Sequence, residues 1–283
     1  MRPALGSGPG LRCREGATAT RRRLDAELVR RGLAASRAQA GELIGAGAVL
    51  VAGSVAAKAA RLVDPAEALE VAAPPARFVS RGGDKLDAAL DQFGLDVTGR
   101  RAIDAGASTG GFTDCLLQRG AAEVVALDVG RGQLHERLRA DPRVRSVERT
   151  NLRFVTPEPL GGPAAVVTAD LSFISLRLVA ARLVSLTAPG GDLVALVKPQ
   201  FEAGRREAAR GRGVIRDPKA WLAALDSAAA AFIAAGAPPC AAAVSALTGA
   251  DGNVEFFLHL RADGDGADLA GAVERAAALG RGR

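Results

Sequence analysis

Residues 102–114 read AIDAGASTGGFTD: a short apolar run that ends in an acid, then a glycine-rich turn, then the start of an amphipathic segment. Glycines let a backbone approach a ligand closely, and a helix that starts after them offers unpaired N–H groups and the positive end of its dipole. The stretch therefore predicts a strand, a ligand-binding turn and a helix. A tight turn without a ligand is the alternative, because glycine turns are common in loops.

The spacing of these glycines narrows the kind of ligand. It is not the G-x-G-x-x-G of dinucleotide sites, and it lacks the lysine and hydroxyl of a phosphate-binding loop. The remaining form, Asp-x-Gly-x-x-x-Gly-Gly, resembles the first motif of S-adenosylmethionine-dependent methyltransferases. Residues 124–128 read VVALD and predict the next strand, after which Asp128 can accept hydrogen bonds from the hydroxyls of a ribose. Together, Asp104 and Asp128 disfavour a turn without a ligand.

Composition indicates the class of protein and its partners. The chain has 283 residues, of which 48% are hydrophobic, enough for a large domain and a small one. The net charge is +6, and arginines gather near the N-terminus, which favours a polyanionic partner. These arginines are Arg12, Arg14, Arg21, Arg22, Arg23, Arg30, Arg31 and Arg37.

Cysteine usage and hydropathy exclude other classes. Cys13, Cys115 and Cys240 are far apart and lack C-x-x-C spacing, so they indicate neither a disulfide framework nor a zinc site. We expect a reducing compartment, the cytoplasm, and no metal. The longest alanine-rich stretch, residues 222–236, is interrupted by Asp226 and is too short to span a bilayer, so we expect no membrane segment.

A compact small domain is predicted at residues 21–72. Apolar spacing that stops at Gly32 predicts a first helix, and Ser36 caps a second helix over 37–46. Two short β-propensity runs around an Ala-Gly turn predict a hairpin at residues 48–55.

The pattern of this segment carries a resemblance. R-x-D-x-x-L-x-x-x-G-L-x-x-S-R-x-x-A from residue 23, followed by G-x-V-x-V-x-G from residue 47, resembles the S4 RNA-binding domain. Arginines on one side of two short helices make a stripe for RNA phosphates, contacts that position an RNA rather than read its sequence. An ordinary solvated arginine face is the alternative. The expected RNA-binding residues are Arg22, Arg23, Arg30, Arg31, Arg37, Gln39 and Lys58, together with Arg81 of the large domain.

Beyond a Pro-Pro linker at residues 74–75, strands alternate with helices, which predicts a mostly parallel sheet. Residues 247–253 are too few for a helix, so the last two strands form an antiparallel pair at one edge, as in the seven-stranded methyltransferase variant of the doubly wound fold. Strands are expected before Gly106 and at residues 124–128, 144–148, 164–170, 192–197, 241–246 and 254–260.

We therefore expect an α/β chain in which a seven-stranded Rossmann-like methyltransferase domain follows a small α+β S4 RNA-binding domain. The expected division is a disordered extension at 1–20, the S4-like domain at 21–72, a linker at 73–79, the methyltransferase domain at 80–263, and a C-terminal helix or tail at 264–283.

Charged residues follow the strands of the large domain, at the edge where ligands of open α/β sheets bind. Asp170 ends the fourth strand, Lys198 follows the fifth, and Glu255 lies in an otherwise apolar strand, where a charge is costly unless paired. Lys85 stands at the start of the helix before the first strand. Each alone could be a structural ion pair. Four charged residues in this order are more specific, and they predict a reactive site.

Seven motifs resemble one family. They read SRGGDKL at 80–86, DAGASTGGFT at 104–113, DVGRGQL at 128–134, ERTN at 148–151, ADLSFIS at 169–175, KPQFE at 198–202 and GNVE at 252–255. In this order they resemble the TlyA family, whose members join an S4 domain to an FtsJ-like ribose 2'-O-methyltransferase and act on ribosomal RNA. The resemblance runs from residue 21 to about residue 261.

The resemblance implies that Lys85, Asp170, Lys198 and Glu255 form a catalytic tetrad, and that the crevice binds S-adenosylmethionine without a metal. The implied substrates are cytidines in large-subunit ribosomal RNA and, in longer members, also in small-subunit RNA. The implied cofactor-binding residues are Asp104, Gly106, Ser108, Thr109, Gly110, Gly111, Phe112, Asp128 and Asn151.

Residue chemistry suggests roles within the tetrad. A ribose 2'-hydroxyl is a weak nucleophile, so the enzyme mainly has to align oxygen, carbon and sulfur. Lys198 is the best candidate for the base, with Lys85 next, because a lysine can lose its proton and an arginine cannot. Asp170 would orient Lys198, and Lys85 and Glu255 would position the hydroxyl.

Two other functions compete with this one. The TlyA name is also tied to haemolysis, but a membrane-lytic protein would need an exposed amphipathic or spanning segment, and the sequence shows none. An RNA-binding protein with an inactive methyltransferase domain is the second, and the complete tetrad and glycine turn argue against it.

Overall fold

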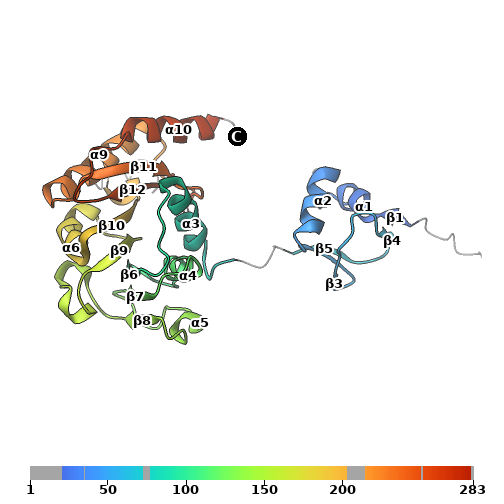
Figure 1. Cartoon of the computed structure of the whole chain (residues 1–283). Coiled ribbons are helices and arrows are strands. Elements are labelled where there is room, and N and C mark those ends of the chain that lie inside the picture. Colours follow the sequence, from blue (N-terminus) through green and yellow to red (C-terminus); the bar gives the residue numbers. More distant parts are fainter. Residues whose placement is uncertain (1–20, 35, 73–76, 203–213, 250, 282–283) are drawn as a thin grey trace, which may run out of the picture. The chain divides into compact units, whose positions relative to one another are not determined.

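The computed structural model describes residues 21–34, 36–72, 77–202, 214–249 and 251–281 (Figure 1). The chain divides between Ala76 and Arg77 into two compact units, called here the small unit and the large unit. The expected extension at 1–20, with Arg12, Cys13 and Arg14, lies outside the described residues, as do residues 73–76 of the expected linker.

The small unit holds two helices and short strands around its own core. Ser36 begins the second helix by accepting a hydrogen bond from the Gln39 backbone N–H, and β2 pairs antiparallel with β3, so both predicted helices and the hairpin are confirmed. The sequence pattern does not predict strands β1, β4 and β5, because they are only two or three residues long. The elements are β1 Arg22–Arg23, α1 Leu24–Arg30, α2 Arg37–Gly45, β2 Val49–Val51, β3 Ser54–Val55, β4 Leu62–Val63 and β5 Leu69–Val71.

The large unit is built on a seven-stranded sheet of order β11-β12-β10-β9-β6-β7-β8. Strand β12 runs antiparallel to both of its neighbours, and the pairs from β10 through β8 are parallel. This confirms the predicted mixed sheet with its antiparallel pair at one edge. The strands are β6 Arg101–Ala105, β7 Glu123–Leu127, β8 Val144–Val147, β9 Ala164–Ala169, β10 Thr187–Val197, β11 Pro239–Val244 and β12 Phe256–Leu260.

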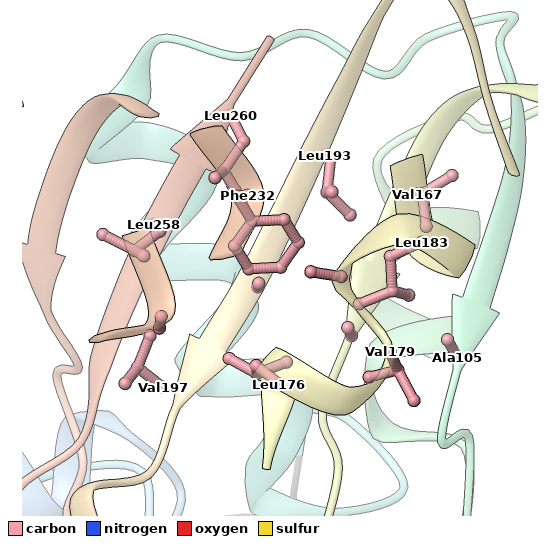
Figure 2. Close-up of a cluster of buried hydrophobic side chains, with 14 of the residues drawn as sticks. Ala105, Val167, Leu176, Val179, Leu183, Leu193, Val197, Phe232, Leu258 and Leu260 are labelled. Atoms are coloured by element: carbon pink, nitrogen blue, oxygen red, sulfur yellow. The ribbon is translucent and has the colours of Figure 1, made fainter. Parts of the chain in front are cut away.

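Helices cover both faces of this sheet (Figure 1). On one face Phe232 and Leu183 pack against strand residues such as Leu193 and Leu258 (Figure 2). On the other face α3 and α4 pack against each other and against the central strands. The helices are α3 Arg81–Phe93, α4 Gly111–Gln118, α5 Glu136–Arg139, α6 Ala180–Leu186, α7 Pro199–Glu202, α9 Pro218–Ala234 and α10 Leu269–Arg281, with the short turns η1 Leu152–Phe154, η2 Glu158–Leu160 and η3 Leu176–Leu178.

Several strand boundaries differ from the prediction by one or two residues, among them those of β11, and the start of β10 differs by more. Strand β10 begins at Thr187, and its register shifts between Thr187 and Asp192, where glycines allow an irregular start that hydrophobic patterning does not reveal. Strand β12 begins at Phe256, so Glu255 lies just before the strand rather than within it. Its side chain is nevertheless buried, as expected for a charge among apolar neighbours. Of the helices in the described residues, none is both long and apolar enough to cross a membrane.

Candidate active site

The glycine turn after β6 sits at the carboxyl edge of the sheet. The backbone N–H groups of Gly106 and Ala107 donate to the Leu127 carbonyl at the end of β7. Gly106 has φ +87°, and a Cβ at this position would lie 2.5 Å from the Asp170 carbonyl oxygen. The turn is therefore packed between the ends of β7 and β9, and only glycine fits where it passes Asp170.

Asp104 supports this turn from inside the protein. The hydroxyls of Thr113 and Thr168 donate to its two carboxyl oxygens, over 2.7 and 3.3 Å. The side chain is fully buried, and this burial raises the pKa of Asp104 to about 7. Asp104 therefore ties α4 to β9 beneath the turn and does not line the crevice, and its expected part in cofactor binding stays a prediction.

Asp128 joins the turn to the end of β7. Its carboxylate accepts the backbone N–H of Ser108 at 2.8 Å and that of Gly130 at 2.7 Å. Asp128 is only partly buried and lines a small depression with Gln133 and Glu148. Because a carboxylate has about four acceptor positions, it can still accept hydroxyls from a ligand.

Asn151, an expected cofactor-binding residue, caps a short turn in the structure. Its side chain accepts the Arg153 backbone N–H and so caps the short turn η1. It lines neither the depression beside Asp128 nor the crevice described next. Sequence spacing places Asn151 after β8, but its side-chain oxygen accepts the capping hydrogen bond from Arg153.

The four charged residues form two ion pairs. Lys198 Nζ lies 2.5 Å from Asp170 Oδ1 and donates to Ser172 Oγ at 3.2 Å. Lys85 Nζ lies 2.6 Å from Glu255 Oε2, and this second pair is more enclosed: the side chain of Glu255 is 3% exposed, against 24% for Asp170.

Both lysines reach one crevice of about 180 Å³. Asp170 and Ser172 also line it, whereas Glu255 lies behind Lys85 and does not. The expected cofactor residues Gly106, Ser108, Thr109, Gly111 and Phe112 form its other wall; Gly110 does not line it, since it packs toward Leu134 and Leu138. The chain thus brings two amines, a carboxylate and a glycine turn to one cavity.

Two aromatic residues, Phe173 and Phe201, lie close to residues of the crevice. Phe173 follows Ser172, has φ +64° and is 92% exposed, and its ring lies 5.3 Å from that of Phe201. A left-handed backbone at a phenylalanine costs energy, and an exposed aromatic ring gains little from its own fold. No periodicity in the sequence signals such a residue, because it belongs to neither a helix nor a strand.

Several arginines of the small unit that are expected to contact RNA form hydrogen bonds with acidic side chains of the same unit. Asp25 accepts from Arg23 and Arg37, and Glu27 accepts from Arg30 and Arg31. These hydrogen bonds hold the pKa of Asp25 well below its ordinary value and that of Glu27 at about 2. Four arginine charges are therefore partly neutralised.

Arg31 departs furthest from its expected role. Its three guanidinium nitrogens donate to Glu27, to the Glu67 carbonyl and to the Pro65 carbonyl, so the side chain braces the small unit. Among the described residues, Arg22 and Lys58 have no carboxylate partner and remain available to an anion. Arg81, at the start of α3, donates to the Thr248 carbonyl and is exposed. Within the described part of the chain, no group of three acidic, histidine or cysteine side chains is placed to hold a metal ion.

Comparison with known proteins gives a consistent result. The model of the FtsJ-like methyltransferase family matches residues 78–262, and that of the S4 domain matches residues 22–69. The chain is 51% identical to the 16S/23S rRNA (cytidine-2'-O)-methyltransferase TlyA of Mycobacterium tuberculosis, over 91% of this chain and 96% of that protein. It is 46% identical to the putative rRNA methyltransferase YqxC of Bacillus subtilis, over 88% and 89%. A solved structure of a putative hemolysin from Streptococcus thermophilus is 37% identical, with a TM-score of 0.70 over 93% of this chain and 98% of that one.

Proposed function

Because the chain belongs to the TlyA family of S4-containing, FtsJ-like methyltransferases, we propose that it transfers a methyl group from S-adenosylmethionine to the ribose 2'-hydroxyl of a cytidine in ribosomal RNA. The substrate is large-subunit RNA, with small-subunit RNA as a second target, and the enzyme acts in the cytoplasm, where ribosomes are. The observation that carries the proposal is the crevice in which two lysines and Asp170 face the glycine turn.

The residues present fit S-adenosylmethionine. Gly106 lines the crevice without a side chain, and the turn at this residue passes close to the Asp170 carbonyl oxygen. Asp128 keeps acceptor positions for ribose hydroxyls, and the Asp170 carboxylate complements a positive charge. When bound, the cofactor supplies an activated methyl group on a cationic sulfur.

The chain's own residues then align and deprotonate the hydroxyl. Lys198 lies at the crevice between Asp170 and Ser172, which fix the direction of its amine. An amine held there in its neutral form can take the proton of a ribose hydroxyl as the oxygen attacks. Lys85, anchored by the buried Glu255, is placed to donate to the same oxygen and hold it in line.

The small unit supplies phosphate contacts. Among the expected contacts of the small unit, Arg22 and Lys58 have no carboxylate partner in the described residues. Arg23, Arg30 and Arg37 are paired with carboxylates, which offset part of their charge. Such contacts supply affinity that depends on salt and orient the RNA without reading its sequence.

The test uses ribosomal subunits from cells that lack this gene. Purified full-length protein and cofactor carrying a labelled methyl group are added, and the 2'-O-methylated positions are mapped. The expected result is label at one or a few cytidines. Absence of label in RNA despite cofactor binding by calorimetry contradicts the proposal and leaves an RNA-binding protein. Leakage of dye from liposomes by the RNA-free protein would instead support the haemolysin function named for the Streptococcus thermophilus protein.

A further inference from the structure

Two segments carry Asp170 and Lys198, and each leaves its strand just before the reactive residue. Residues 170–176 follow β9 and lead into η3, and Lys198 follows β10 and leads into α7. The distance between the amine and the carboxylate therefore depends on how these two segments are held together. Because the proposed reaction depends on how the reacting groups are aligned, a small displacement of either segment should slow methyl transfer.

Glu202 joins the two segments. Its carboxylate accepts Ser175 Oγ at 2.5 Å and the Leu176 backbone N–H at 2.7 Å. The side chain is 1% exposed, and Arg177 lies at 4.0 Å from it, too far for a close ion pair. Buried carboxylates are costly unless their hydrogen bonds are satisfied, so these two donors account for its presence.

Backbone hydrogen bonds link Glu202 to Lys198. The backbone N–H groups of Phe201 and Glu202 both donate to the Lys198 carbonyl, so Glu202 stands one helical turn beyond the lysine. In the segment of residues 170–176, the Asp170 N–H donates to the Ala105 carbonyl, and this hydrogen bond fixes the start of the segment. The hydrogen bonds to Glu202 fix the end, at Ser175 and Leu176.

The segment between these anchors needs such a restraint. It contains Phe173 in a left-handed backbone, an energetically costly conformation that persists only where the surroundings hold it. The Leu176 side chain is buried in the core on one face of the sheet, so the end held by Glu202 does not move with solvent-exposed residues (Figure 2).

We propose that Glu202 is a positioning residue for methyl transfer: through hydrogen bonds to Ser175 and Leu176 it sets the placement of Asp170 and Ser172 against Lys198. This rests on the proposed function. The role is geometric rather than electrostatic. A glutamine of the same shape can keep both bonds, because its carbonyl accepts the Leu176 N–H and its amide donates to the Ser175 hydroxyl.

The experiment measures single-turnover methyl transfer at saturating cofactor and ribosomal substrate for wild type, Glu202→Ala, Glu202→Gln and Ser175→Ala. We expect Glu202→Ala to slow transfer by about 10- to 100-fold, as for misplaced reacting groups, and Glu202→Gln to stay within about threefold of wild type. Cofactor affinity by calorimetry should be unchanged in each, because Glu202 does not contact the glycine turn. Ser175→Ala should slow transfer less, and in the double variant with Glu202→Ala the two effects should not add.

Controls separate positioning from loss of stability. Asp192→Asn alters another buried carboxylate of the large unit, near the other end of β10, where it accepts hydrogen bonds from Arg100 and His259. It should lower the denaturation midpoint and leave the single-turnover rate unchanged. The proposal is overturned if Glu202→Ala transfers at the wild-type rate, if Glu202→Gln is as slow as Glu202→Ala, or if the slow variants lose cofactor affinity in parallel. Failure of the wild type itself to methylate RNA would instead contradict the proposed function.

Discussion

Replacing Asp104 by asparagine should change how the stability of the large unit depends on pH. Burial raises the pKa of this carboxyl to about 7 in the folded protein, while an unfolded chain titrates it at its ordinary value of 3.8. Between these two values the folded state binds the proton and the unfolded state does not. Stability contributed by Asp104 is therefore fully present below about pH 4 and is lost as pH rises to about 7.

The magnitude follows from the width of that window. Each pH unit within it removes about 1.4 kcal/mol from the free energy of unfolding, so the whole window removes roughly 4 kcal/mol. Asparagine has no proton to lose and keeps an oxygen that can accept from Thr113. Between pH 5 and pH 7 the stability of wild type should thus fall by roughly 3 kcal/mol relative to Asp104→Asn.

Urea unfolding from pH 5 to pH 8, followed by tryptophan fluorescence, measures this difference. Trp221 is the single tryptophan of the chain and lies buried in the large unit, so the signal reports that unit alone. Asp141→Asn is the matched control: hydrogen bonds from Arg143 hold the pKa of Asp141 below its ordinary value, so it stays ionised over this range in both states. Parallel pH curves for wild type and Asp104→Asn would refute the reasoning, because they would mean that the buried carboxyl keeps its ordinary pKa.

Three further outcomes test the site and the small unit. Lys198→Arg should slow single-turnover transfer by about 10²- to 10⁴-fold with cofactor binding intact, because arginine cannot release a proton. A rate within about threefold of wild type would instead mean that Lys198 only balances the charge of Asp170. Gly106→Ala should weaken cofactor binding by more than about 10-fold, because a left-handed backbone costs alanine about 1–2 kcal/mol and the new methyl group would overlap the Asp170 carbonyl. Gly94→Ala is the control: its φ is similar, but the space around it is open, so cofactor binding should not change. The double variant Arg22→Glu and Lys58→Glu should weaken RNA binding, and the dependence of its affinity on salt should correspond to about two fewer phosphate contacts. Arg31→Ala should instead lower the thermal stability of the small unit.

Much of the fold could be predicted because it depends on local pattern. Alternating strands and helices, the short connection after β11 and the glycine turn each have a direct sequence signature, and together they predict the mostly parallel sheet with its antiparallel pair at one edge. Topology also brings Lys85, Asp170 and Lys198 to one edge of the sheet, so their convergence could be predicted without knowing any side-chain contact.

Side-chain partners could not be predicted in the same way, because they depend on packing between distant segments. The sequence places Asp104 and Asp128 alike, each at the end of a strand. Two threonines close over Asp104 and exclude it from the crevice, while Asp128 stays partly exposed. Arg31 stands in a row of arginines, yet it donates to two carbonyls more than thirty residues away as well as to Glu27.

The different enclosure of the two ion pairs bears on which lysine acts as the base in the proposed mechanism. Removing the proton from Lys85 would leave Glu255, 3% exposed, as an unpaired buried charge, and breaking a buried pair in this way costs about 3–5 kcal/mol. Asp170 is 24% exposed, so solvent and substrate can stabilise its charge when Lys198 becomes neutral. In the proposed mechanism this difference in enclosure favours Lys198 as the base and leaves Lys85 to hold the hydroxyl oxygen. Glu255→Gln should accordingly weaken the placement of Lys85 without removing the base, and its single-turnover rate should fall less than that of Lys198→Arg.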